Sequence, residues 1–230
     1  MSATARPERG GASSLASPRL AALAARAGRA TAVSGDSGET AAAPATEGVC
    51  DLCAEPIGPR HGHLVEVRER KLLCACRPCS LLFQEDGAGG GRYRLVPDRV
   101  RRLAEFALDE MDWLALRIPV DLAFFFHSTA AGRVVALYPG PMGATESRLS
   151  LEHWERMEER NPVLSDMLDD VEALLVDRRE DGDPAGWLVP IDVCYELVAL
   201  FRTHWVGLSG GPEVREAVSD FFEELRRRAD

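Results

Sequence analysis

The hydrophobic residues that follow position 98 form short, nearly continuous runs separated by turn residues. Four such runs fall into two pairs, residues 118–126 with 133–138 and residues 171–176 with 186–190. Ala-Ala-Gly at residues 130–132 separates the first pair, and Asp-Gly-Asp-Pro at residues 181–184 separates the second. Short apolar runs bounded by Gly, Pro or Asp are typical of strands. The pattern therefore predicts two pairs of neighbouring strands.

Three other segments repeat their apolar residues every three or four positions, which is typical of a helix with one buried face. The first runs from about residue 150 to Arg160, and Asn161-Pro162 ends it. The other two close the chain. Their apolar positions are Cys194, Leu197, Val198, Phe201 and Trp205 in one helix, and Val214, Ala217, Val218, Phe221 and Leu225 in the other. Cys194 is therefore expected in the hydrophobic core.

A further helix is expected over residues 98–112, with Asp98 at its N-cap. Together with the strand pairs and the two closing helices, it predicts one α+β domain over residues 98–230. A chain of 230 residues with 46% hydrophobic content can form a domain of this size and one smaller module.

Residues 47–86 contain five of the six cysteines of the chain. Cys50 and Cys53 form one C-x2-C pair, Cys76 and Cys79 form a second, and 22 residues separate the two pairs. Two chelating thiolate pairs at this spacing are typical of small zinc modules. We therefore predict one tetrahedral metal site made by these four cysteines.

The segment between the two cysteine pairs predicts a β-hairpin that turns at residues 68–71, and a helix is expected to begin near Cys79. Cysteines at a turn and at a helix start, joined by a hairpin, indicate a treble-clef or ribbon-like module. Turns of this kind favour Gly after the second cysteine of each pair, whereas this chain has Ala54 and Ser80 there.

Three residues of the hairpin are alternative ligands, each as a substitute for one of the four thiolates. They are Cys74, His61 and His63. Cys74 is two residues before Cys76, so it is expected on the same strand face and near the metal, as an apolar side chain or as a free thiol. The two histidines are expected either as ligands or as a solvated pair at a turn.

The spacing of the cysteines leaves the identity of the metal open. Zinc is the expected cofactor, because most modules with paired cysteines are structural zinc sites. A rubredoxin-type iron site or an iron–sulfur cluster is the alternative, and a redox-active thiol site shares the same layout.

Two segments outside the domains have compositions that argue against stable structure. Residues 1–46 are mainly Ala, Gly, Ser, Thr and Arg, with almost no large apolar side chains, so a disordered tail is expected. Residues 87–97 begin with Gly-Ala-Gly-Gly-Gly and are expected to form a flexible linker.

Five arginines occur among the eleven residues 92–102. A basic segment beside a zinc module suggests contact with nucleic acid. The formal net charge of the chain is −10, however, and most acidic residues follow Asp98, so that domain would repel a phosphate backbone. Nucleic acid is therefore an unfavoured partner, and an acidic protein surface is an equal target for these arginines.

The chain carries no recognisable catalytic signature. The histidines outside the hairpin stand alone, without a paired base or a metal-binding motif; they are His127, His153 and His204. A run of acidic residues is expected on a solvated face; its members are Asp166, Asp169, Asp170 and Glu172. An enzymatic activity is therefore uncertain, and a binding protein is favoured.

No apolar run approaches the roughly 18 residues of a membrane span, so no membrane-spanning helix is expected. The N-terminal segment also lacks the apolar core of a signal peptide, because Arg19, Arg26 and Arg29 interrupt its alanines. A cytoplasmic location is therefore expected. Thiols stay reduced in that compartment, which favours metal ligands over disulfides.

Several segments together resemble a known group of proteins. They are CDLC, HGHL, LLCACRPCSLLF, YRLVPDRV, IPVDLAFFF, YPGPMGATES, DVEALLV and LVPIDVCYELV. Over about residues 47–226 the chain resembles an uncharacterised bacterial family encoded beside high-affinity NiFe hydrogenases. The resemblance implies an accessory to hydrogenase assembly or to the associated electron transfer, with a hydrogenase component as the protein partner.

Two functions from different classes follow. The first is a metal-binding accessory protein whose cysteine module relays electrons or contacts a hydrogenase component. The alternative is a regulatory adaptor in which zinc is purely structural and residues 92–102 bind nucleic acid or protein.

Overall fold

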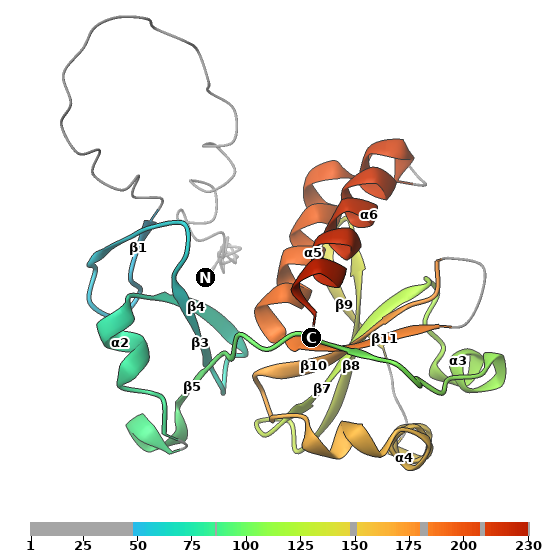
Figure 1. Cartoon of the computed structure of the whole chain (residues 1–230), viewed down its shortest axis with the longest axis horizontal. Coiled ribbons are helices and arrows are strands. Elements are labelled where there is room, and N and C mark those ends of the chain that lie inside the picture. Colours follow the sequence, from blue (N-terminus) through green and yellow to red (C-terminus); the bar gives the residue numbers. More distant parts are fainter. Residues whose placement is uncertain (1–47, 86, 148–150, 180–183, 208–209, 230) are drawn as a thin grey trace, which may run out of the picture. The chain divides into compact units, whose positions relative to one another are not determined.

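The computed structural model describes residues 48–85, 87–147, 151–179, 184–207 and 210–229 (Figure 1). The expected tail at residues 1–46 lies outside these ranges, as does most of the expected turn at residues 181–184. The described part of the chain combines antiparallel sheets with five α-helices. The predicted α+β class is therefore confirmed.

The larger sheet has six strands in the order β6-β11-β10-β7-β8-β9, and every neighbouring pair is antiparallel. Its strands are β6 (Arg101–Leu103), β7 (Leu122–Ser128), β8 (Arg133–Gly140), β9 (Gly143–Ser147), β10 (Glu172–Asp177) and β11 (Ala185–Pro190). The pairs β7–β8 and β10–β11 confirm the two strand pairs that the hydrophobic runs predicted.

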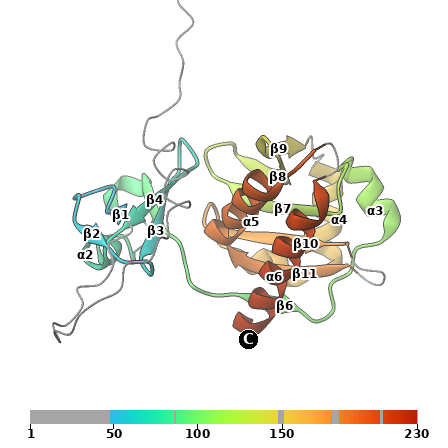
Figure 2. The ribbon, with the colours of Figure 1, turned by 90° about the horizontal axis from the view of Figure 1, so that it is seen from above.

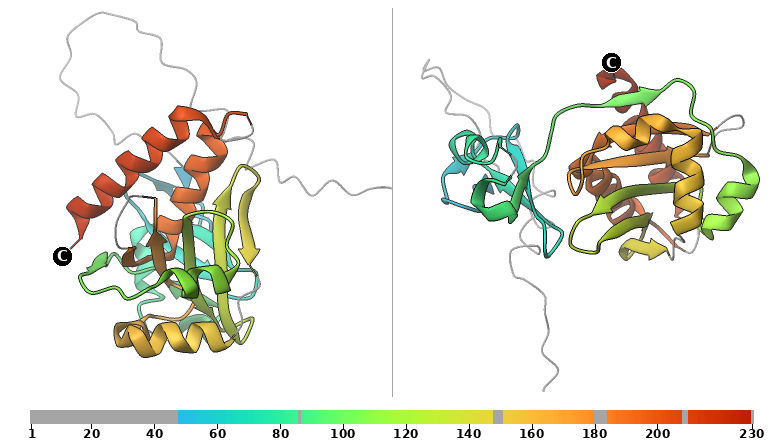
Figure 3. Two further views of the ribbon diagram at one scale, coloured as in Figure 1. Left: turned by 90° about the vertical axis from the view of Figure 1, so that its right-hand side faces the viewer. Right: turned by 90° about the horizontal axis from the view of Figure 1, so that it is seen from below.

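Helices cover both faces of this sheet, as the two views in Figure 3 show. The helices are α3 (Glu110–Leu116), α4 (Leu151–Arg160), α5 (Ile191–His204) and α6 (Gly211–Arg228). α5 and α6 share one hydrophobic cluster with Phe124 and Phe126 of β7, whereas α3 and α4 share the other with Phe125. Because successive residues of a strand point to opposite faces and both faces are buried, the strand is apolar at consecutive positions.

The three helices predicted from apolar periodicity are present as α4, α5 and α6. In α4, Trp154 and Met157 are buried. α5 and α6 lie next to each other over the strands (Figure 2). Cys194 of α5 is fully buried in the cluster on that face, which confirms the expected core position.

The prediction of a helix over residues 98–112 is wrong. Part of this segment forms the edge strand β6, which pairs with β11, and α3 follows only after Asp109. Asp109 is the N-cap of α3, and its carboxylate accepts a hydrogen bond from the Asp112 amide at 2.8 Å. The free edge of β11 supplies hydrogen-bond partners that local helix propensity does not register, so tertiary pairing decides the outcome.

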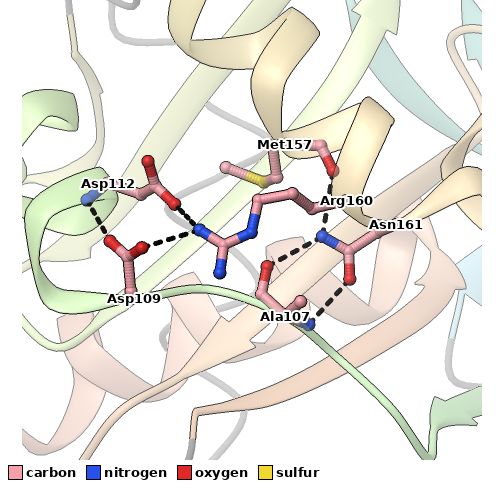
Figure 4. A network of polar contacts seen from close by, with 6 residues as sticks. All are labelled: Ala107, Asp109, Asp112, Met157, Arg160 and Asn161. Carbon is pink, nitrogen blue, oxygen red and sulfur yellow. Dashed lines mark hydrogen bonds and ion pairs between the residues drawn. The ribbon is translucent and has the colours of Figure 1, made fainter.

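A polar network fixes the segment before α3 to the end of α4 (Figure 4). The buried Asn161 side chain accepts a hydrogen bond from the Ala107 amide at 2.8 Å. It donates to the carbonyl oxygens of Ala107 and Met157, both at 2.9 Å. Arg160 forms ion pairs with the two aspartates at the start of α3. The residue that ends α4 therefore also anchors a neighbouring loop.

The cysteine-rich part of the chain is built on shorter strands. β3 (Gly62–Glu66) and β4 (Lys71–Ala75) form the predicted hairpin. β1 (Gly48–Val49) pairs with β2 (Pro56–Ile57) on either side of the first cysteine pair. The five-residue helix α2 (Arg77–Leu81) carries the second pair and begins with Cys76 as its N-cap, slightly before the expected start.

The segment expected to be a linker, residues 87–97, is more ordered than its glycines indicate. Its first half forms the short 3-10 turn η1 (Ala88–Gly91), and β5 (Tyr93–Leu95) then joins the small sheet beside β3. Val65 of β3 and Val96, just after β5, belong to the hydrophobic cluster that includes α5 and α6. Residues 93–95, which were predicted to be part of a flexible linker, therefore pair with the edge of β3.

Two of the four acidic residues expected on a solvated face are buried. Glu172 has 0% exposed surface and accepts hydrogen bonds from the Arg99 guanidinium at 2.9–3.1 Å. Asp170 accepts from the Thr129 amide and hydroxyl, and its carboxylate lies 3.8 Å from Arg94. The other two, Asp166 and Asp169, are exposed as expected. Burial of the first two is tolerated because each has a nearby cation and hydrogen-bond donors.

Candidate metal centre

The sulfur atoms of the four predicted ligands, Cys50, Cys53, Cys76 and Cys79, all lie within 4.8 Å of one another. The first two lie in the turn between β1 and β2, and the other two lie at the start of α2. Three of the cysteines are buried and Cys53 is exposed. The hairpin β3–β4 therefore returns the chain to bring the two pairs together.

The separation between sulfurs is that of metal ligands rather than of a disulfide. The sulfurs of Cys53 and Cys76 are 3.6 Å apart. A disulfide bond would be about 2.05 Å long. Four sulfurs at about 2.3 Å from one tetrahedral zinc ion would be about 3.8 Å apart. The donor set and its spacing thus fit a tetrathiolate metal site, and little movement is needed to close it around an ion.

The turn that carries the first pair has the left-handed conformation expected after its second cysteine, although the residue there is not glycine. Ala54 has φ = 61°, and its amide donates to the Cys50 carbonyl oxygen at 2.9 Å. The Cys50 amide donates to the Glu55 carbonyl oxygen at 2.8 Å. The backbone therefore folds tightly around the two thiols despite the Cβ atom of Ala54.

Backbone amides favour negative charge on the sulfur of Cys50. Burial raises the pKa of the Cys50 thiol, but amides of Cys76, Cys53 and Leu52 donate to its sulfur, and the net pKa is about 6. The neighbouring thiols of Cys76 and Cys53 raise the pKa of Cys79 far above its ordinary value. One thiolate thus disfavours the next, so a cation is needed to ionise the whole cluster.

The three alternative ligands do not stand in for any of these four cysteines. His61, His63 and Cys74 form a second group, with one ligand atom from each within 4.8 Å of the others. Cys74 was expected beside the tetrathiolate site, but its sulfur lies with the two imidazoles. The carboxylate of Asp192 accepts a hydrogen bond from His63 Nδ1 at 2.7 Å. This contact and a hydrogen bond with Cys74 raise the pKa of His63 to about 9.

Comparison with known proteins gives one match. The model of a family of unknown function, DUF5947, matches residues 49–229. The chain belongs to the DUF5947 family. No curated protein and no solved structure matches the chain. The DUF5947 region contains both cysteine pairs and the six-stranded sheet, so the metal module and the larger sheet are parts of one family unit.

Several other candidate residues of this DUF5947 chain have structural contacts. Among the five arginines of residues 92–102, three meet buried carboxylates; these are Arg92 with Glu66, Arg94 with Asp170 and Arg99 with Glu172. A fourth, Arg102, lies over the Trp187 ring. These contacts give four of the five arginines a partner within the described part of the chain.

The isolated histidines take no part in a ligand cluster within the described ranges. The Nε2 atom of His127 lies 3.3 Å from a carboxylate oxygen of Glu158.

Asp192, which contacts His63, is the residue of the candidate site that the sequence did not indicate. It follows His63 by 129 positions, so no local spacing indicates it.

Within the ranges that the structure describes, no helix has the length and apolar character to cross a membrane.

Proposed function

We propose that this DUF5947 protein is a metal-binding accessory protein in which Cys50, Cys53, Cys76 and Cys79 hold one zinc ion. The observation that carries the proposal is the convergence of four sulfurs within 4.8 Å of one another. The ion would hold two short segments together in a part of the chain that has few other means of doing so. The small cluster there has only seven buried residues, and three of them are ligands.

Zinc is favoured over iron on the character of the site. Structural zinc sites are closed, four-coordinate and rich in cysteine, and they contribute directly to folding. Iron in the same set of ligands would supply a one-electron redox centre, which zinc lacks. Three of the four ligands are buried, as befits a closed site.

We further propose that the accessory role concerns a NiFe hydrogenase, in its assembly or in the associated electron transfer. This part rests on the resemblance of the segments CDLC, HGHL and LVPIDVCYELV, among others, to proteins encoded beside such enzymes. If the ion is zinc, the site relays no electrons, and assembly or docking is the role that remains. The partner is then a hydrogenase component.

The metal is tested on full-length protein purified without oxygen. We expect about one tightly held zinc ion in the four-cysteine site and a colourless solution. Cys50→Ser and Cys79→Ser should lose that ion, whereas Cys194→Ala, which changes a core cysteine outside the ligand cluster, should keep it. A coloured protein that bleaches on reduction would replace zinc with iron. Protein without zinc or iron after reduction would refute the metal site.

The hydrogenase role requires a separate test. The purified chain is mixed with the large and small subunits of a NiFe hydrogenase encoded beside it, and complex formation is followed by size-exclusion chromatography. We expect a complex with the wild-type chain that Cys50→Ser weakens and Cys194→Ala does not. Absence of a complex, together with normal hydrogenase activity in cells lacking the chain, would refute the role and leave the zinc assignment intact.

A further inference from the structure

The second group of metal-binding side chains is positioned by the hairpin itself. His63 of β3 lies directly opposite Cys74 of β4 in the antiparallel register. Side chains of such a pair lie on the same face, with Cβ atoms about 4.5–5.5 Å apart. His61 is two residues before His63, and the two imidazole rings meet edge to face with centroids 4.8 Å apart. The three side chains therefore converge from β3, from β4 and from the residue just before β3.

Hydrogen bonds fix which nitrogen of each imidazole is free to bind a ligand. The Nδ1 atom of His61 lies 2.8 Å from the Gly58 carbonyl oxygen, which only accepts, so Nδ1 carries the proton. The Nδ1 atom of His63 donates in the same way to Asp192. In both rings Nε2 is then the ligand atom, and at His63 a metal ion would displace the ring proton and the hydrogen bond with Cys74, since a ligating imidazole is neutral. This arrangement is typical of metal-bound histidines, which donate their other ring N–H to a carboxylate or a carbonyl group.

The Nε2 atom of His61 is buried and has no hydrogen-bond partner among the residues that the structure describes. A buried polar atom without a partner is destabilising, and native structures contain few of them. A metal ion bound at this nitrogen would satisfy it. The neighbouring donors, an imidazole and a thiol, are the ligand types that late transition metals prefer.

We propose that His61, His63 and Cys74 form a second metal site, distinct from the tetrathiolate site, that binds a late divalent transition metal such as Zn²⁺. The three ligand atoms lie within 4.8 Å of one another. Ligands around one tetrahedral zinc ion are about 3.4–3.6 Å apart at the usual Zn–N and Zn–S distances. Rotations of the three half-buried side chains would bring the ligand atoms to these separations.

Three protein ligands leave one coordination position of a tetrahedral ion open. Zinc sites with three protein ligands and an exchangeable fourth are those that bind or activate small molecules, whereas closed four-cysteine sites are structural. His61 and His63 line an open groove of about 1370 Å³, together with Asp192 and Arg228. The fourth position therefore faces a space that admits water or a small ligand.

The two sites are connected through one aspartate. The Asp51 amide donates to the Cys74 carbonyl oxygen, and the Cys74 amide donates to the Asp51 carboxylate, both at 2.8 Å. Asp51 lies between the first two cysteines of the tetrathiolate site. Filling the tetrathiolate site thus fixes the backbone that presents Cys74. Loss of the first ion should weaken the second, whereas loss of the second should leave the first in place.

The test uses full-length reduced protein titrated with Zn²⁺ in competition with a chromophoric chelator. We expect two ions per chain for wild type, and one for His61→Gln, His63→Gln and Cys74→Ser. The one ion that each variant retains shows that its cysteine module is still folded. The matched control is His127→Gln, another histidine beside a carboxylate, which should bind two ions.

Asp192 is a positioning residue in this scheme, because it touches His63 and not the ion. Asp192→Asn should weaken the second ion by about 10- to 100-fold and leave the first unchanged. Co²⁺ added to the one-zinc protein gives an independent readout, since its visible bands should appear in wild type and not in His61→Gln.

Two results would overturn the second site. One is a wild-type chain that binds a single ion lost on Cys50→Ser and kept on His61→Gln. The other is a second ion that all three substitutions leave in place. Loss of an ion on His61→Gln but not on Cys50→Ser would support this site and refute the tetrathiolate one, so the two assignments fail separately.

Discussion

The ion pair between Arg99 and the buried Glu172 provides a direct test of how the basic segment is used. Arg99→Met removes the charge and the donors while keeping most of the side-chain stem. The Glu172 carboxylate then stays in the interior with one remaining donor among the described residues, the Leu168 amide at 3.0 Å. We expect the variant to be folded but clearly less stable than wild type.

The magnitude follows from the burial of the two partners. Removing one partner of a fully buried ion pair costs about 3–5 kcal/mol, because the remaining charge has no compensation. Glu172 is 0% exposed, but the Arg99 side chain is 45% exposed, so water can approach from its side. We therefore expect a loss near the lower limit, about 3 kcal/mol in the free energy of unfolding. Glu172→Gln in the Arg99→Met background should recover part of it.

Urea unfolding followed by circular dichroism measures the effect, with the slope of the transition compared between variants. Arg133→Met is the matched control, because Arg133 pairs with the partly exposed Glu146, and the expected loss there is below about 1 kcal/mol. Equal losses for Arg99→Met and Arg133→Met would refute the reasoning. It would also fail if the double variant were less stable than Arg99→Met alone.

Three further predictions concern the packing and the metal. Asn161→Ala should lower the free energy of unfolding by about 2–3 kcal/mol in urea titrations, because the partly buried N–H and carbonyl groups of Ala107 lose their partner and the Met157 carbonyl oxygen loses one of its two donors. Ser165→Ala, at an exposed hydroxyl, should change it little. Ala54→Gly should raise the thermal midpoint, since it removes about 1–2 kcal/mol of left-handed strain at φ = 61° and adds about 0.5–1 kcal/mol of conformational entropy cost; a lower midpoint would contradict this. Lowering the pH from about 8 to about 5 should release the zinc to a chelator, because protons compete for the thiolates; retention at pH 5 would argue against thiolate ligands.

Residue types and their spacing were enough to predict much of this protein. The apolar runs predicted β7, β8, β10 and β11, and the helical periodicity predicted α4, α5 and α6. These elements are readable because burial imposes a period of about two on strands and 3.6 on helices. The two C-x2-C pairs likewise predicted which four sulfurs lie together, because the 22 residues between them contain a hairpin that brings one pair back to the other.

Other features depended on partners that are distant in the sequence. Residues 101–103 and 93–95 are strands only because β11 and β3 offer free edges to them. Asp170 and Glu172 belong to an acidic run that, by its residue types alone, is typical of a solvated surface. The arginines that pair with their buried carboxylates lie more than seventy positions earlier. Local propensity contains no information on either pairing.

The second group of ligands shows most clearly which features the sequence determines and which the tertiary structure decides. The sequence determined that His61, His63 and Cys74 lie in one hairpin, and it left them as substitutes for the four cysteines. The register of β3 against β4 decided that Cys74 faces His63, and the start of α5 supplied Asp192 to orient the ring. A shift of one residue in that register would turn Cys74 to the other face of the sheet. Strand pairing and the packing of α5, rather than the spacing of residue types, therefore separate one cysteine cluster into two groups of ligands.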